Sequence, residues 1–138
     1  MTAQLERFVD AQRDVYPSVL TELHRGHKTG HWIWFIFPQV AGLGRSATSQ
    51  AFAIRSLEEA RAYLAHPILG ARLRECASVV AALEGRDTVE IFGPLDAMKV
   101  RSSMTLFLRA APDEAVFALV LDRFYDGLPD EATDALLG

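Results

Sequence analysis

The segment from residue 28 to residue 46 constrains the fold most, because it holds both tryptophans and an unbroken run of six apolar residues. That run, from Trp32 to Phe37, is rich in aromatic and β-branched residues, and Pro38 ends it. Because it is short for a helix, we expect it to be extended and buried. In an extended chain Trp32 and Trp34 point to the same side, where they would either belong to the core or form a stacking wall for a planar ring.

A glycine-rich loop follows the aromatic run. Gly42 and Gly44 bracket Leu43 and lead into Arg45 and Ser46. Backbone N–H groups and a guanidinium in this arrangement can face an anion. The alternative is a tight turn in which Arg45 is simply solvated.

Helical periodicity accounts for most of the remaining chain. No alternating strand pattern of useful length occurs outside the aromatic run, so we predict an all-α single domain, residues 1–138, with an irregular aromatic central segment. Capping patterns, prolines and glycines set the expected boundaries. The predicted helices are 3–15, 17–26, 57–66, 67–85, 95–109, 112–127 and 130–137, with about one turn at 87–92. The first two are either separate helices or one helix kinked at Pro17.

Composition narrows the class of protein. With 138 residues, half of them hydrophobic, the chain can bury one proper core. A net charge of -4 argues against general nucleic-acid binding. The lone cysteine, Cys76, excludes an internal disulfide and a cysteine zinc cluster, and we expect it to be a core residue. The N-terminal residues lack a signal peptide's apolar stretch and no window approaches a membrane span, so we expect a cytoplasmic protein without membrane contact.

A second polar cluster occupies the predicted helix 95–109. Lys99, Arg101, Ser102, Ser103 and Thr105 place two cations and three hydroxyls within seven residues. At helical spacing these groups run beside the apolar stripe, where a pocket wall can form. The alternative has the cations solvated and the serines bonded to local backbone.

The histidines do not predict a metal site. His24, His27 and His31 have suggestive spacing, but Gly26 and Gly30 interrupt any helix that would present them on one face. We therefore predict no metal and no cofactor.

Three residues are candidates for catalysis. His31 could serve as an acid, a base or a hydrogen-bond donor, or it could cap local backbone. Gln39 could read an amide or base edge, or satisfy backbone at the end of the aromatic run. Asp96 is the carboxylate nearest in sequence to the cluster at Lys99 and Arg101.

Four motifs together resemble a known family. HWIWFIFPQ, GLGRS, LEEARAYLAHPILGARLREC and KVRSSMTLF look like the bacterial family catalogued as domain of unknown function 1810. The resemblance covers nearly the whole chain and implies a mostly helical cytoplasmic protein without an established activity. The calpastatin label sometimes attached to that family carries no weight, because this chain has a globular core rather than the composition of a disordered inhibitor repeat.

A remoter similarity concerns ligand class. The order of a glycine-rich basic loop, an EARAYLAHP helix and a KVRSSM helix is similar to that of the NADAR family, small helical proteins linked to ADP-ribose and other NAD-derived substrates as N-glycosidases. The glutamate and tryptophan contexts of that family are not clearly matched here. No catalytic residue is therefore carried over.

These features lead to one functional hypothesis and one alternative. The hypothesis is binding of a phosphorylated ribosyl or nucleotide-like ligand, and whether the protein also hydrolyses an N-glycosidic bond of that ligand is left open. The alternative is a non-enzymatic interaction or regulatory domain whose aromatic segment is only core, and the oligomeric state is left open. In the first, Arg45, Ser46, Lys99, Arg101 and Ser102 would hold phosphate, Trp32 and Trp34 would stack on the ring, and His31, Gln39 or Asp96 would act on the reacting bond.

Overall fold

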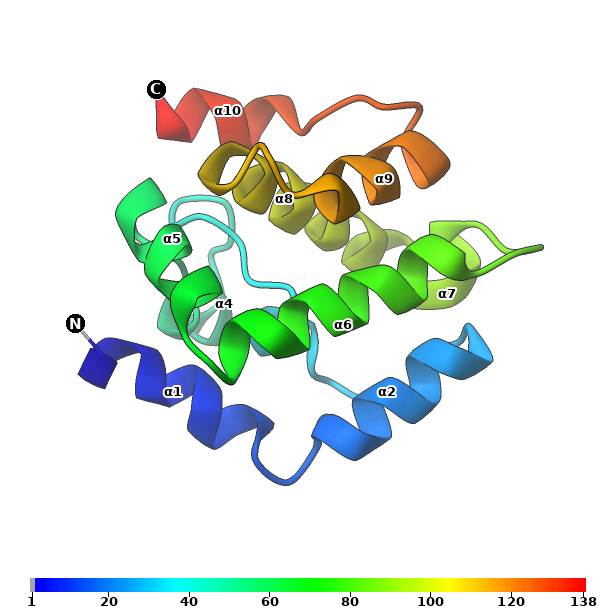
Figure 1. Ribbon diagram of the computed structural model, residues 1–138, viewed down its shortest axis with the longest axis horizontal. Coiled ribbons are helices and arrows are strands. Elements are labelled where there is room, and N and C mark those ends of the chain that lie inside the picture. The colour runs from blue at the N-terminus through cyan, green and yellow to red at the C-terminus, as the bar shows by residue number, and fades with distance from the viewer. Residues whose placement is uncertain (1) are drawn as a thin grey trace.

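Two long helices, α6 and α8, form the centre of the molecule, which we describe from a computed structural model covering residues 2–138 (Figure 1). The α6 helix packs against α2, α5 and α9, and α8 packs against α5, α7, α9 and α10. The prediction of an all-α fold is confirmed, since the described residues form helices and no β-strand. The helices are α1 (Thr2–Gln12), α2 (Tyr16–Arg25), α3 (Ile33–Ile36), α4 (Ala47–Ala51), α5 (Leu57–Ala65), α6 (Leu69–Ala82), α7 (Thr88–Phe92), α8 (Pro94–Ala110), α9 (Ala115–Phe124) and α10 (Glu131–Leu137).

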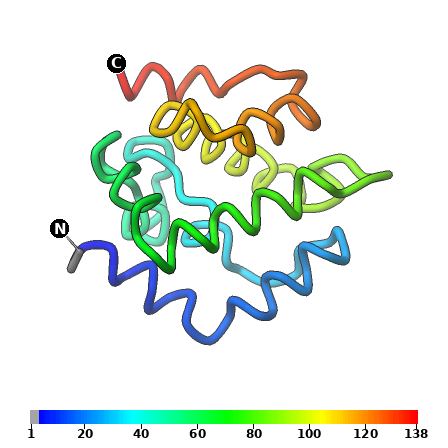
Figure 2. The backbone as a smooth tube through the Cα atoms, in the orientation of Figure 1, coloured from blue at the N-terminus to red at the C-terminus, as the bar shows by residue number. Residues whose placement is uncertain are grey.

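The outer helices lie on opposite sides of this centre. In the backbone trace α1 and α2 form a V along one side, and α10 lies along the other (Figure 2). A short turn separates α1 from α2, so the first predicted helix ends at Gln12 rather than at Val15. None of the helices in residues 2–138 is long and apolar enough to cross a membrane.

Local signals explain most helix boundaries. Pro17 lies in the first turn of α2, and Gly26 ends that helix in the left-handed conformation, with φ 71°. Asp87 and Glu90 form the predicted capping box at the start of α7. Ser56 caps α5 through the backbone N–H of Glu59. The sequence therefore places these helix starts correctly to within one or two residues.

A row of aromatic rings runs through the core from α1 to α9. The ring centroids of Phe8 and Tyr63 are 5.1 Å apart, those of Tyr63 and Phe107 are 5.4 Å apart, and those of Phe107 and Phe117 are 5.9 Å apart. These separations fall in the range in which aromatic side chains attract one another. Cys76 is also fully buried, and burial raises the pKa of its thiol to about 12, so its predicted place in the core is confirmed.

The expectation of an extended aromatic run is wrong. Residues Ile33–Ile36 form the single helical turn α3, in which the N–H of Ile36 donates to the carbonyl of Trp32 and the N–H of Phe37 to that of Ile33. A buried segment must satisfy its backbone polar groups, and with no neighbouring strand available it does so internally. The two tryptophans consequently do not form one wall: Trp32 is 3% exposed, whereas Trp34 is only partly buried.

One pair of backbone hydrogen bonds closes the segment 39–55 on itself. The N–H of Ala41 donates to Ile54 and the N–H of Ile54 donates to Gln39, each at 2.8 Å, which forms an isolated parallel bridge between Val40 and Ile54. The glycine-rich loop and α4 lie between these ends. This closure fixes both ends of the loop.

Candidate functional site

A groove runs between the glycine-rich loop, the first half of α8 and the start of α10. Its volume is about 270 Å³. We call it the α8 groove. The sequence placed three of its residues, Gln39, Lys99 and Ser102, among the candidate site residues, and the structure brings these three together. The groove is lined by Gln39, Leu43, Gly44, Leu95, Met98, Lys99, Ser102, Asp130 and Ala132.

Lys99 supplies the positive charge of the α8 groove. Its ammonium lies 3.2 Å from Oδ1 of Asp96, one helical turn earlier, and 6.0 Å from the centroid of the Trp34 ring. The other oxygen of Asp96, Oδ2, lies 2.8 Å from the ammonium of Lys28. Asp96 does not itself line the groove, and its contact with the groove is through the ammonium of Lys99.

Trp32 is anchored in the core and does not line the groove. Oε1 of Glu22 accepts hydrogen bonds from the N–H groups of Thr29 (2.6 Å) and Gly30 (2.8 Å) and from the Trp32 indole (3.0 Å). Burial acts to raise the pKa of the Glu22 carboxyl, but these donors outweigh it, so the pKa lies below its ordinary value. Glu22 thus fixes the chain that leads from α2 into α3.

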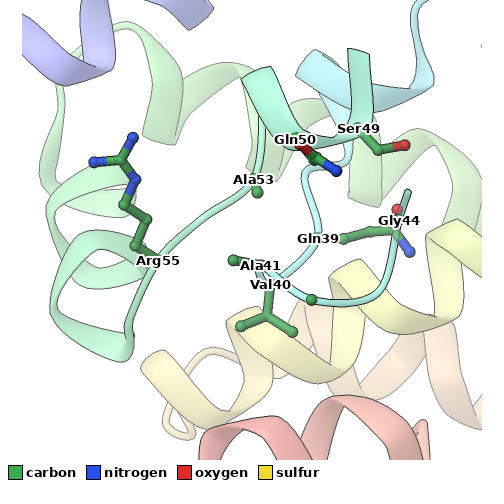
Figure 3. Close-up of a pocket in the computed structure, with 9 residues that line it drawn as sticks. Gln39, Val40, Ala41, Gly44, Ser49, Gln50, Ala53 and Arg55 are labelled. Atoms are coloured by element: carbon green, nitrogen blue, oxygen red, sulfur yellow. The ribbon is translucent and has the colours of Figure 1, made fainter. Parts of the chain in front are cut away.

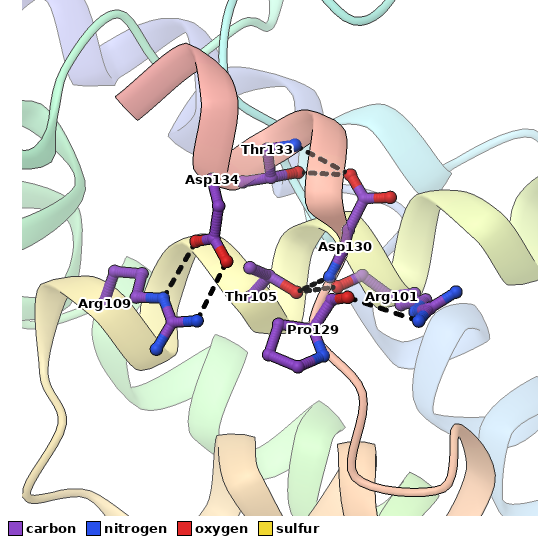
Figure 4. Close-up of polar contacts among 7 residues, drawn as sticks. All are labelled: Arg101, Thr105, Arg109, Pro129, Asp130, Thr133 and Asp134. Atoms are coloured by element: carbon purple, nitrogen blue, oxygen red, sulfur yellow. Dashed lines mark hydrogen bonds and ion pairs between the residues drawn. The ribbon is translucent and has the colours of Figure 1, made fainter. Parts of the chain in front are cut away.

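Asp130 brings a carboxylate to the other wall of the α8 groove. Its Oδ2 accepts hydrogen bonds from the hydroxyls of Ser102 and Thr133 and from the N–H of Thr133, where Asp130 caps α10. In the close-up one carboxylate oxygen faces Thr133 and the other points away (Figure 4). Within residues 2–138, Oδ1 receives no hydrogen bond. This oxygen can therefore accept one from a ligand hydroxyl.

The glycine-rich loop offers donors beside the same groove. Across the described chain, the N–H groups of residues 42–46 donate to no acceptor, and the Arg45 guanidinium has no partner. Ser46 caps α4 by accepting from the N–H of Ser49. A Cβ on Gly44 would lie 2.3 Å from that of Ser49, so the close approach of loop and helix requires glycine.

A second, smaller hollow of about 110 Å³ lies on the other side of the loop. Gln39 and Gly44 line both hollows, and Ser49 and Gln50 from α4 complete one end of the smaller one (Figure 3). The guanidinium of Arg55 is turned away from these residues in that view. The side-chain amide of Gln39 makes no hydrogen bond with the described residues, so it is available to a ligand from either hollow.

Two further candidates lie outside the α8 groove. Arg101 donates to the carbonyls of Leu128 (2.8 Å) and Pro129 (3.2 Å), and so holds the connection between α9 and α10 (Figure 4). Its guanidinium is engaged by backbone rather than directed at Lys99. His31 is exposed and makes no hydrogen bond within residues 2–138.

Several residues of the site were not found by sequence reasoning. Lys28, Glu22 and Asp130 are far from α8 in sequence, and only the fold brings Lys28 and Asp130 to it. Leu95 and Met98 are apolar residues next to the polar cluster of α8, and their place in the sequence was not recognised as part of a site. In the structure their side chains are 73% and 68% exposed and interrupt the polar face of α8. No group of three or more histidines, cysteines or carboxylates suited to a metal ion occurs in the part of the chain that the structure describes.

Comparison with known proteins supports the sequence resemblance. The family model described as "Protein of unknown function (DUF1810)" matches residues 2–137. The chain is also similar to the crystal structure of the conserved hypothetical protein Rv1873 from Mycobacterium tuberculosis, with 52% identity over 96% of this chain and 95% of that one and a TM-score of 0.95. No curated protein matches this chain. The similarity to the NADAR family stays a prediction.

Proposed function

The chain belongs to the DUF1810 family, and from the geometry of its α8 groove we propose that it binds a phosphorylated ribosyl or nucleotide-like ligand. The observation that supports this proposal is that Lys99 and Asp130, one carboxylate oxygen of which accepts no hydrogen bond from residues 2–138, line one groove together with exposed apolar side chains. An ammonium for phosphate, a carboxylate oxygen for a sugar hydroxyl and an apolar surface for a planar ring are complementary to that ligand class.

Phosphate is expected at the junction of α8 and the glycine-rich loop. Lys99 lines the groove there beside Leu43 and Gly44, and the unengaged cation Arg45 follows in sequence. Unpaired backbone N–H groups and cations both favour a bound anion. The sequence analysis also assigned Arg101 to the phosphate, but the proposed phosphate site does not include it, because its guanidinium donates to the carbonyls of Leu128 and Pro129 between α9 and α10.

The sugar and the ring are expected along α8 towards α10. Asp130 can accept from one ribose hydroxyl, and Gln39 offers both a donor and an acceptor. Leu95 and Met98 provide the apolar surface against which a base can lie. A volume of about 270 Å³ holds a ribosyl phosphate-sized group rather than a whole dinucleotide.

The reaction we propose to test is hydrolysis of an N-glycosidic bond. Water would add its hydroxyl to C1′ of the ribose, the C1′–N bond would break, and the released base would take a proton. Gln39 is the candidate to orient the water, because its amide is uncommitted, and Asp96 would act through Lys99. His31 would take part only if the ligand extends to the exposed surface at α3.

The alternative, a non-enzymatic interaction domain, is favoured by one observation. Leu95 and Met98 are among the most exposed large apolar side chains, and they lie one turn apart on α8. Contiguous exposed apolar residues mark protein-binding surfaces as well as ligand grooves. The two functions differ in what Lys99 does, because an apolar protein contact does not require its charge.

Ligand binding by matched variants separates the two functions. Thermal-shift and calorimetric titrations with ribose 5-phosphate, AMP, ADP-ribose and NAD would be compared with titrations using ribose and adenosine. Lys99→Met should weaken binding of the phosphorylated compounds about tenfold to a hundredfold, since a hydrogen bond to a charged group contributes about 1.5–3 kcal/mol. Release of free base, followed by chromatography, reports hydrolysis.

Arg13→Met is the control variant. Arg13 pairs with Asp10 three residues earlier, as Lys99 pairs with Asp96, but it lies at the end of α1, away from the groove. The Arg13→Met substitution also removes one positive charge, and it should leave the affinities for the phosphorylated compounds unchanged. Wild-type protein that binds none of the phosphorylated compounds, or equal affinity in Lys99→Met and wild type, would contradict the proposed function.

A further inference from the structure

Both lysines of the chain contact the same carboxylate. The chain has two lysines, Lys28 and Lys99, among its fourteen cationic residues. The ammonium of Lys28 lies 2.8 Å from Oδ2 of Asp96, and that of Lys99 lies 3.2 Å from Oδ1. Although the two lysines are far apart in sequence, one on the loop after α2 and the other on α8, the fold joins them into a single ionic cluster.

The two lysines differ in access to the α8 groove. Lys99 lines the groove with 24% of its side chain exposed, whereas Lys28 is 8% exposed and does not line it. The ammonium of Lys28 also donates to the carbonyl of Gly30 at 2.5 Å and lies 5.2 Å from the centroid of the Trp32 ring. Its backbone N–H donates to Ile91 of α7 at 2.7 Å. Lys28 is therefore a fixed, interior cation.

We propose that Lys28 is a positioning residue, which neutralises Asp96 and so leaves the charge of Lys99 available to an anionic ligand group in the α8 groove. This inference rests on the proposed function. With two ammonium groups and one carboxylate the cluster carries one net positive charge, and only Lys99 presents it to the groove. Without Lys28, the Asp96–Lys99 pair would be neutral, and its carboxylate would compete with the incoming anion.

The scarcity of lysine permits a direct chemical test. Pyridoxal 5′-phosphate is an anionic aldehyde, and pyridoxal is its analogue without phosphate. A lysine amine adds to the aldehyde with loss of water, and borohydride reduces the resulting imine to a stable amine that peptide mass spectrometry locates. The measured quantity is the ratio of the Lys99 labelling rates by the two reagents. Because both reagents form the same bond, this ratio cancels changes in the reactivity of the amine itself.

Three variants shift the charge of the cluster in known directions. Lys28→Met should lower the ratio about threefold or more, and Asp96→Asn should raise it by a similar factor, because each changes one unit charge near the bound phosphate. The double variant Lys28→Met/Asp96→Asn restores one net positive charge and should return the ratio to that of the wild type. Asp130 and Arg45 are unchanged throughout, so their charges do not affect the comparison.

The same set of variants distinguishes an effect of misfolding from an effect of charge. Lys28→Met leaves Asp96 with one partner and is the variant at risk of destabilisation, whereas the double variant removes both charges together. Circular dichroism and thermal melting establish that each variant is folded before labelling. Lys28→Arg keeps the charge and should keep the ratio, which separates an electrostatic role from a packing role.

Two results would overturn the inference. One is a ratio that stays the same in Lys28→Met and Asp96→Asn, and the other is a double variant that resembles Lys28→Met. These outcomes differ from failure of the proposed function, in which wild-type protein binds no ribosyl phosphate in the titrations while the labelling ratios still follow the charge of the cluster.

Discussion

Replacement of Glu22 by glutamine tests the anchor that fixes the aromatic segment. The variant keeps the shape of the side chain and removes its charge. Oε1 of Glu22 accepts three N–H hydrogen bonds at 2.6, 2.8 and 3.0 Å. A hydrogen bond to a charged group contributes about 1.5–3 kcal/mol and a neutral one about 0.5–1.5, so each bond loses about 1 kcal/mol. Because the three donors share one oxygen, we expect a loss of about 2 kcal/mol rather than the full sum.

The dependence of this loss on pH follows from the sign of the pKa shift. The pKa of Glu22 is lower in the folded protein than its ordinary value, so its contribution to the free energy of unfolding is complete above the unfolded pKa, near 4.3. That contribution falls as the pH drops through the folded pKa. The difference between wild type and Glu22→Gln should therefore be largest near neutral pH and should shrink below about pH 4.

Urea unfolding followed by tryptophan fluorescence measures this difference. Both tryptophans lie in the segment that Glu22 anchors, so their emission reports on it directly. For a domain of this size about 2 kcal/mol corresponds to roughly 8 °C in melting temperature. Glu6→Gln, at an exposed position of α1, should change stability by less than about 0.5 kcal/mol. A loss that small in Glu22→Gln, or one that stays constant with pH, would refute the reasoning.

Two other substitutions test how the groove is built. Gly44→Ala should destabilise the protein by about 1–3 kcal/mol, because its Cβ would overlap the side chain of Ser49, and Ser49→Gly in the same chain should restore most of the loss in thermal melting. Arg101→Met should lower stability by about 1–2 kcal/mol, through the lost contacts with Leu128 and Pro129, yet leave the affinity for ribosyl phosphates unchanged in calorimetry. A large affinity loss in Arg101→Met would restore this residue to the phosphate site.

Sequence reasoning succeeded where a local signal decides the structure. Apolar spacing and caps suffice for most helices, because each boundary depends on a few neighbouring residues such as Asp87 and Glu90. It failed at α3, where the residues favour a strand but no partner strand exists. The strand propensity of Trp32 and its neighbours comes from their side chains. The structure they adopt depends on which acceptors are within reach of their backbone N–H groups.

The candidate site was visible only in part for a related reason. Gln39, Lys99 and Ser102 were nominated from their types and local spacing, and the fold places them in one groove. Lys28 and Asp130 could not be nominated, since their relevance comes from contacts between distant segments. Arg101 was nominated but does not belong to the groove. It lies two residues after Lys99 on α8, and side chains two residues apart on a helix point in different directions.

The hydrogen bonds that close the segment 39–55 make the position of its ends independent of the length of the residues between them. The bonds joining Ala41 and Ile54 keep the ends together whatever lies between them. The entropy of closing a loop grows slowly with its length, by about 0.6 kcal/mol for each doubling, so the tip can gain or lose residues at little thermodynamic cost. Insertions or deletions at the tip would thus reshape the rim of the groove, while the helical body that carries Lys99 stays the same.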